Sequence, residues 1–244
     1  MGRSVFARQM TALARAGWRT LRLEEFARRN DAVGAQHAAP LPSAQRTFLL
    51  TFDDGYASLA EHAYPILADL GFTATTFLIT DYVGKMNTWD VPYTWNRLPH
   101  LGWDTIERWR AQGFEFASHG ATHRRLTWLD DLTVAAELQR SREALMARLG
   151  PEAGHAVAYP FGAADERVVR LAAAAGYQLG FGGVQGNGSA LHLPRVPVYI
   201  WDVWATPLGL RRGIAGMVGR FTAHIANRCA TGTSLLQAME HPRP

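Results

Sequence analysis

Hydrophobic and polar positions along this chain switch repeatedly between a two-residue and a 3.6-residue period, which predicts strands that alternate with amphipathic helices. Strands are predicted at 47–52, 73–79, 114–118, 155–159, 177–181 and 195–200. Helices are predicted at 4–17, 24–29, 58–71, 103–112, 131–149 and 165–175, with a last one around 214–225. Repeated strand–helix units of this length are typical of a parallel sheet with helices packed outside it. We expect a closed or nearly closed barrel rather than an open sheet.

Two segments lack either period and are predicted to be irregular. The first is the loop 30–43, which contains Gly34, Pro40 and Pro42. The second, 80–102, carries Trp89, Tyr93 and Trp95. Aromatic residues concentrated in a loop either pack that loop onto the core or form a platform for flat sugar faces. Both interpretations stay open.

The length of 244 residues allows one large α/β domain or two small ones, and the ordinary globular composition favours one. We therefore predict a single domain over 1–244. Its core spans about 45–200, preceded by helices and a loop in 1–44 and followed by a helix and tail in 205–244.

Charge and cysteine content narrow the function classes. The formal net charge of +4 comes mostly from scattered arginines, without a basic tract that interleaves aromatic residues, so nucleic-acid binding is not expected. The single cysteine, Cys229, excludes an internal disulfide. It also directs any metal site towards histidine and carboxylate ligands.

The amino-terminal pattern bears on localisation. Phe6, Met10 and Leu13 are spaced as one face of a helix and not as the apolar core of a signal peptide. No stretch of the sequence reaches the length of a membrane span. We therefore expect a cytoplasmic protein, unless an export segment precedes the given chain. Whether a further strand precedes the first helix stays open. The sequence does not determine an oligomeric state.

Unusual residues follow three of the predicted strands. Asp53 and Asp54 come after the first, His119-Gly-Ala-Thr-His123 follows another, and Tyr159-Pro160-Phe161-Gly162 follows a third. Side chains just beyond the carboxyl ends of parallel strands converge on one face, where the active sites of α/β proteins lie. Each motif alone has a simpler explanation, namely a strand-ending turn or a surface histidine pair. The combination indicates a site.

The two histidines suit a metal ion. Their spacing of four residues brings both imidazoles to one side of a turn. With a carboxylate from another strand end they supply two nitrogens and one oxygen, a three-ligand set that leaves a position open for water or substrate.

These residues resemble the polysaccharide deacetylase family (NodB homology, carbohydrate esterase family 4). The first family motif, Thr-Phe-Asp-Asp-Gly, matches residues 51–55, and the second, His-x-x-x-His, matches His119 and His123. The resemblance implies a distorted or incomplete (β/α) barrel and a divalent metal, with Zn²⁺ first and Co²⁺, Ni²⁺ or Mn²⁺ as alternatives. It also implies hydrolysis of an N-acetyl or O-acetyl group on a sugar.

The resemblance also implies a role for each matched residue. Asp54, His119 and His123 would bind the metal, and Asp53 would be the general base that takes a proton from the attacking water. The backbone N–H of Phe161 would stabilise the oxyanion. Tyr159 and Pro160 would fix that turn beside the substrate.

The sequence departs from the family pattern at two positions. Ala158 stands where fuller motifs carry an arginine that orients the base, and we predict that Arg195, in Leu193-Pro194-Arg195, replaces it. The alternative is a surface arginine at a strand start. The late Leu-x-His motif that carries the general acid is not evident, and neither His192 nor His224 has a recognisable setting, so the acid is not assigned.

The sequence thus predicts a metal-dependent hydrolase that acts on an acetylated saccharide, with Trp89, Tyr93 and Trp95 as candidates for sugar stacking. Two alternatives remain. One is a hydrolase of the same superfamily that cleaves a C–N amide bond in a non-sugar substrate. The other is a non-catalytic carbohydrate-binding protein that kept the fold.

Overall fold

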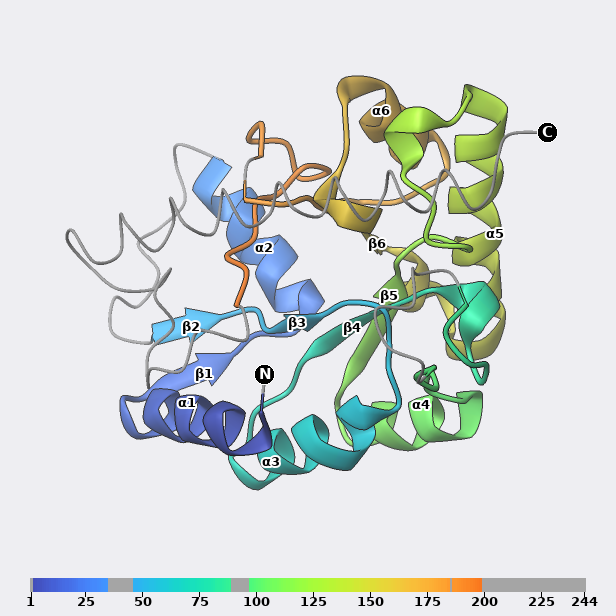
Figure 1. Cartoon of the computed structure of the whole chain (residues 1–244). Coiled ribbons are helices and arrows are strands. Elements are labelled where there is room, and N and C mark those ends of the chain that lie inside the picture. The colour runs from blue at the N-terminus through green and yellow to red at the C-terminus, as the bar shows by residue number, and fades with distance from the viewer. Residues whose placement is uncertain (1, 35–45, 89–96, 185, 199–244) are drawn as a thin grey trace.

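The computed structural model describes residues 2–34, 46–88, 97–184 and 186–198. Its centre is a five-stranded parallel sheet whose strand order follows the chain (Figure 1). These strands are β3 (Thr51–Phe52), β4 (Thr75–Leu78), β5 (Glu115–Ser118), β6 (Ala156–Ala158) and β7 (Leu179–Phe181). A second parallel pair is formed by β1 (Trp18–Thr20) and β2 (Arg46–Phe48).

Helices connect the strands, as expected for parallel pairing. They are α1 (Arg3–Arg15), α2 (Leu23–Gly34), α3 (Tyr64–Asp69), α4 (Trp103–Arg110), α5 (Asp131–Leu149) and α6 (Glu166–Ala174). Short helical turns are η1 (Leu59–Ala63), η2 (Thr80–Tyr82), η3 (Leu126–Trp128), η4 (Pro151–Gly154) and η5 (Pro160–Gly162). Carboxylates cap the starts of α5 and α6: Asp130 accepts from Thr133 N at 2.9 Å, and Asp165 accepts from Val168 N at 2.8 Å.

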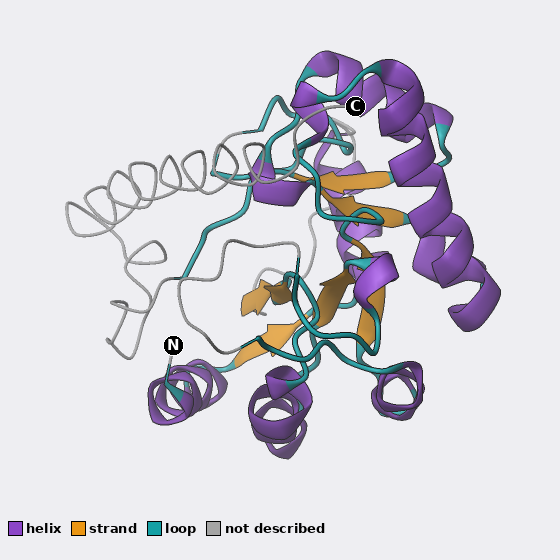
Figure 2. Ribbon diagram, turned by 45° about the vertical axis from the view of Figure 1, so that its right-hand side comes forward, coloured by secondary structure: helices purple, strands orange, loops and turns teal. Residues whose placement is uncertain are grey.

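The sheet curls, and the helices α1, α3, α4, α5 and α6 surround its outer side (Figure 2). The five described strands form half a barrel and do not close on themselves. The prediction of a distorted or incomplete (β/α) barrel is therefore confirmed. No helix in the described ranges has both the length and the apolar character that a membrane crossing requires.

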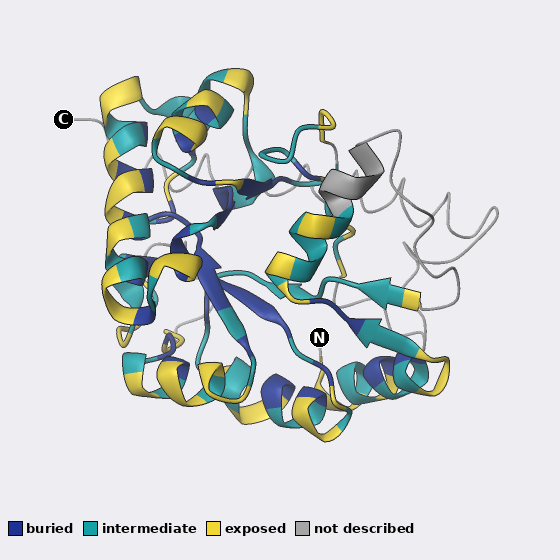
Figure 3. Ribbon diagram, turned by 180° about the vertical axis from the view of Figure 1, so that it is seen from behind, coloured by how far each residue is buried: buried dark blue, intermediate teal, exposed yellow. Residues whose placement is uncertain are grey.

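The outer core is aromatic. Tyr64 of α3 is fully buried, packs against Phe114 with ring centroids 4.7 Å apart, and shares a 2.7 Å hydrogen bond with Thr76. Burial is greatest in strands β4 to β7, whereas β1, β2 and β3 are mostly half-buried (Figure 3). The helices turn their exposed sides to solvent. This packing holds the sheet rigid beneath the strand ends.

The inner core is completed by α2. The ring centroid of Phe26 in α2 lies 5.9 Å from that of Phe181 in β7. The ring centroid of Phe181 in turn lies 5.4 Å from that of Phe77 in β4. Glu115 of β5 holds the start of this helix, because its carboxylate accepts a 2.8 Å hydrogen bond from Leu23 N. The concave side of the sheet is therefore filled by a helix.

The predicted strand 47–52 is wrong as a single element. It divides into β2 and β3, which belong to different sheets. Between β2 and β3 the chain crosses from one sheet to the other. Leu49 packs against the core cluster that contains Phe77 and Phe181, and Leu50 packs against the cluster that contains Tyr64.

Three further boundaries differ from the predictions. α2 extends to Gly34, so 30–34 is helix and not loop. The helix expected at 58–71 begins as the π-helical turn η1, since Pro65 has no N–H to continue the regular ladder. Residues 195–198 do not form the predicted strand. Pro194 and Pro197 explain this, because a proline has no N–H to donate to a strand ladder. Residues 199–200 and the helix predicted at 214–225 lie outside the described residues.

Candidate metal centre

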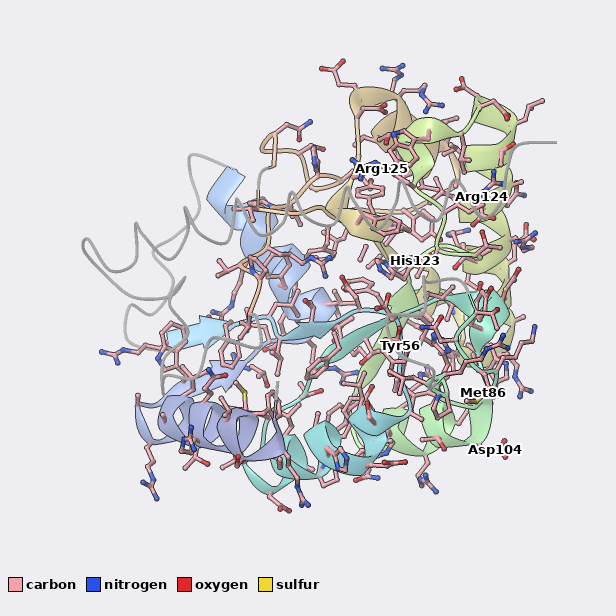
Figure 4. All side chains as sticks on the ribbon, in the orientation of Figure 1. Tyr56, Met86, Asp104, His123, Arg124 and Arg125 are labelled. Carbon is pink, nitrogen blue, oxygen red and sulfur yellow. The ribbon has the colours of Figure 1, made fainter. Side chains whose placement is uncertain are left out.

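The candidate centre lies at the carboxyl ends of β3 and β5. Asp53 and Asp54 follow β3, and His119 follows β5 directly. His123 lies just beyond β5, near the middle of the molecule, while Arg124 and Arg125 lie towards α5 and α6 (Figure 4). The parallel arrangement thus brings side chains that are 65 or more positions apart in sequence to one place.

Backbone strain is concentrated at this place. Within the described ranges, the residues other than glycine with positive φ are Asp54 (69°), His123 (62°) and Phe161 (60°). The left-handed conformation costs roughly 1–2 kcal/mol for a residue with a Cβ. Such strain persists where the surrounding structure enforces it, and it clusters at functional sites.

Asp54, His119 and His123 fit the donor set of a metal ion. Asp54 Oδ1 lies 3.5 Å from His119 Nε2 and 3.4 Å from His123 Nε2. One candidate ligand atom from each of the three residues lies within 4.8 Å of the others. Ligands about 2.0–2.2 Å from a common tetrahedral ion are about 3.3–3.6 Å apart, so the spacing suits Zn²⁺.

The surroundings of both imidazoles favour the neutral form, which is the form that binds a cation. His119 is 2% exposed and its Nδ1 donates to Ala158 O at 2.7 Å, which leaves the lone pair on Nε2 facing Asp54. Burial lowers the pKa of His119, against an opposing effect of Asp53. Burial and then the charge of His119 lower the pKa of His123 well below its usual value. Both rings are therefore neutral at physiological pH, as metal ligands must be.

Arg195 forms a bidentate ion pair with Asp53. Nη1 and Nη2 donate to the two carboxylate oxygens at 2.7 and 2.8 Å, and Nε donates to Gly182 O at 3.1 Å. Burial, the largest single effect, raises the pKa of Asp53, but the charge and hydrogen bonds of Arg195 together with the neighbouring histidines outweigh burial and hold that pKa far below the usual range. Asp53 is thus ionised, and its side chain keeps 34% of its surface exposed.

The turn after β6 supports the centre from the side. The ring of Phe161 lies 4.7 Å from that of His123. Tyr159 is fully buried and donates its hydroxyl to Leu191 O at 2.8 Å, and Pro160 is buried too. These two residues therefore brace the turn, and direct contact of either with substrate stays a prediction.

The structure does not test most of the remaining candidate residues. Trp89, Tyr93, Trp95 and His224 lie outside the described residues. The ring of His192 lies 6.4 Å from that of Tyr159. No interaction of His192 with Asp53 appears among the described contacts, so it gains no role in the site.

Sequence reasoning missed two groups near the centre. His100 stacks on Tyr56 at 4.9 Å and acts electrostatically on His123, yet nothing in its sequence surroundings marks it. Glu137 contacts Thr122, the residue before His123. A signal for Glu137 existed, because its carboxylate stands on the side of the predicted helix that also carries Leu138 and Leu145.

The comparison with protein families agrees with this geometry. The family model described as "Polysaccharide deacetylase" matches residues 41–180 of the chain. This range includes every residue of the centre except Arg195.

Individual relatives carry similar descriptions. YxkH of Bacillus subtilis, named as a polysaccharide deacetylase, is 28% identical over 63% of this chain and 52% of its own length. The poly-beta-1,6-N-acetyl-D-glucosamine N-deacetylase of Staphylococcus aureus is 25% identical over 62% of this chain and 54% of its own. The chain thus matches about half the length of these curated relatives.

A solved structure shares the fold. The deacetylase PplD of Streptococcus pyogenes, determined in complex with acetate, superimposes with a TM-score of 0.65 at 25% identity. The match covers 79% of each chain.

Proposed function

The chain belongs to the polysaccharide deacetylase family, and from this premise we propose that it is a metal-dependent hydrolase that removes an acetyl group from an N-acetylated or O-acetylated saccharide. The observation that carries the proposal is that two adjacent carboxylates have different partners. Asp54 Oδ1 lies within 3.5 Å of both histidines, whereas both oxygens of Asp53 are bound by Arg195.

Asp54, His119 and His123 would hold the metal. When bound there, a divalent ion would polarise the acetyl carbonyl and lower the pKa of a water molecule. Zn²⁺ is our first choice, because neutral imidazoles and one carboxylate are its usual ligands in open sites. Co²⁺, Ni²⁺ and Mn²⁺ share enough of this preference to be alternatives.

Asp53 would be the general base. Its low pKa keeps it ionised, so it can accept a proton from the attacking water. Its Oδ2 lies 3.9 Å from His119 Nε2, which places it beside the metal ligands. Arg195 would orient the carboxylate of Asp53. It would thus replace the orienting arginine of the fuller family motif, whose position is occupied by Ala158 in this chain.

The backbone N–H of Phe161 would stabilise the oxyanion that forms when the acetyl carbonyl is attacked. The positive φ of Phe161 and the close approach of Gly162 to Gly183 support this role, because they fix the turn. A Cβ on Gly162 would come within 2.7 Å of Gly183 N.

The substrate would be a saccharide that carries an acetamido group, as in the polymer named for the Staphylococcus aureus relative. Trp89, Tyr93 and Trp95 remain proposed stacking residues for its sugar rings. The general acid stays unassigned.

The test is acetate release by the metal-loaded protein. We expect acetate from an N-acetylglucosamine oligosaccharide, loss of release after chelation, and recovery when Zn²⁺ is returned. A parallel panel of O-acetylated sugars and of small linear and cyclic amides identifies the substrate class. Turnover of the amides alone would contradict the saccharide assignment, and metal-independent sugar binding without turnover would contradict the hydrolase.

A further inference from the structure

We propose that Glu137 of α5 is a positioning residue that holds the 119–123 loop in its metal-binding shape, so that its carboxylate sets the metal affinity of the centre. The inference rests on the metal site of the proposed function. Glu137 itself contacts neither histidine ring in the described contacts, and it acts on them through Thr122.

The carboxylate of Glu137 accepts two hydrogen bonds from Thr122, the residue that precedes His123. Thr122 N donates to Glu137 Oε2 at 2.9 Å, and Thr122 Oγ1 donates to Oε1 at 2.8 Å. Glu137 is only 5% exposed. Burying a carboxylate is costly unless its oxygens are hydrogen-bonded, and here both oxygens are used on one loop residue.

The opposite side of the loop is held by η2. Thr80 N donates to Gly120 O at 3.2 Å, and Asp81 N donates to Ala121 O at 3.0 Å. The carbonyls of the loop are therefore bound by one element and the N–H of Thr122 by another. Two elements therefore hold the 119–123 loop by hydrogen bonds, η2 and α5, and together they form a clamp on it.

Arg140 joins the two sides of the clamp. Its Nη2 lies 2.9 Å from Asp81 Oδ2 and 3.4 Å from Glu137 Oε1. Because Arg140 is about half exposed, this ion pair adds little stability by itself. It keeps Glu137 beside a positive charge without drawing it away from Thr122.

The loop needs such a clamp because its shape is strained. His123 has a φ of 62° and Gly120 a φ of 78°, and an unsupported histidine would relax to negative φ. A Cβ on Gly120 would make only an ordinary contact with Glu137 Oε2, at 3.9 Å, so the glycine is needed here for its positive φ and not for space. Relaxation of His123 would move its Nε2 away from Asp54 and open the ligand set.

Glu137 places a charge on the buried side of α5, where a carboxylate needs hydrogen-bonding partners. Val134, Leu138 and Ser141 surround Glu137 on the buried side of α5. The presence of a carboxylate there is explained by the loop it binds. Partners that orient metal ligands in this indirect way typically contribute about 10–100-fold to metal affinity.

The experiment compares Glu137→Gln with Glu143→Gln, a matched change at an exposed position of the same helix. For each folded apoprotein, the Kd for Zn²⁺ is measured by competition with a chromophoric chelator, and the absorption spectrum of the Co²⁺ form is recorded. We expect a Kd raised about 10-fold for Glu137→Gln, with altered Co²⁺ bands. Glu143→Gln should match the wild type.

A second pair covers the case in which Glu137→Gln does not fold. Thr122→Val removes one of the two donors and should raise the Kd, whereas Thr122→Ser retains the hydroxyl and should restore it. The inference would be overturned if Thr122→Val, and Glu137→Gln where it folds, had the Kd and the Co²⁺ spectrum of the wild type. A lower melting temperature of the apoproteins would not change that conclusion. A wild type that binds no divalent ion would instead overturn the proposed function, and this inference with it.

Discussion

At the scale of single residues, Arg195 decides the state of the proposed base. Its three donor nitrogens are all used, two on Asp53 and one on Gly182 O, and its guanidinium lies 5.6 Å from the ring centre of Phe77. The orientation of the fork is thus set by the backbone and by the inner core. Lysine offers a single charged nitrogen and cannot reproduce this geometry.

We predict that Arg195→Ala lowers kcat/KM about 100-fold while leaving the metal content unchanged. Asp53 must be ionised to accept a proton, so activity is lost as the pH falls through its pKa. Arg195 holds that pKa down, and its removal therefore moves the acidic limb of the pH profile to higher pH.

The pH profile of kcat/KM for wild type, Arg195→Lys and Arg195→Ala checks this prediction. Arg195→Lys should fall between the other two, because it keeps the charge and loses the fork. An unchanged acidic limb in Arg195→Ala would show that Arg195 does not control the base.

The residues of the site differed in how readily the sequence predicted them. Asp53, Asp54, His119 and His123 stand in short motifs directly after strands, so local sequence indicates their convergence. Arg195 is 142 positions from Asp53, and only its Leu-Pro-Arg setting suggested it. Glu137 was missed because its pairing with Thr122 leaves no pattern in the sequence, and its place on the buried side of the predicted helix was the one signal for it.

At the scale of elements, α5 was predicted with the bounds 131–149 that the structure has. Both of its ends carry local signals, an Asp130 cap before it and Gly150-Pro151 after it. The strand at 47–52 was mispredicted because periodicity cannot reveal a change of sheet within an apolar run. Tertiary packing decides such boundaries.

The start of α2 supplies a pH-dependent test at this scale. Burial raises the pKa of Glu115, against the hydrogen bond from Leu23 N. The folded protein therefore retains the proton at pH values where the unfolded chain has lost it. This contribution to stability is fully present below the ordinary pKa near 4.5 and is lost as the pH rises through the raised value.

We predict that Glu115→Gln removes this dependence. The free energy of unfolding of the wild type, relative to the variant, should decrease between about pH 4 and pH 7, as measured by denaturant titration at each pH. Glu24→Gln is the control, because it removes an exposed carboxylate from the first turn of the same helix. A relative stability that rises with pH would contradict the account.

At the scale of the whole molecule, the candidate centre joins elements that are distant in the chain. Asp54 belongs to the end of β3 and the histidines to the end of β5, with β4 between these strands. A bound ion would therefore link the carboxyl ends of β3 and β5 to each other. The fold class was predictable from the alternating pattern, whereas the filling of the concave side by α2 depends on contacts that no local pattern shows.

We predict that Zn²⁺ stabilises the folded protein. At a free concentration 100 times the Kd, the gain is about 2.7 kcal/mol, which appears as a rise in Tm. Asp54→Ala should abolish the rise, and Glu61→Ala, at an exposed position of η1, should retain it. An equal rise in Asp54→Ala would place the ion elsewhere.

The central claim is that Asp53 and Asp54 have different tasks, and one measurement tests it most directly. Acetate release from an N-acetylglucosamine oligosaccharide is compared between wild type and Asp53→Asn, each with its bound metal quantified. We predict about one equivalent of metal in both proteins and acetate release at least 100-fold slower in Asp53→Asn. Undiminished release with full metal content would contradict the assignment of Asp53 as the base.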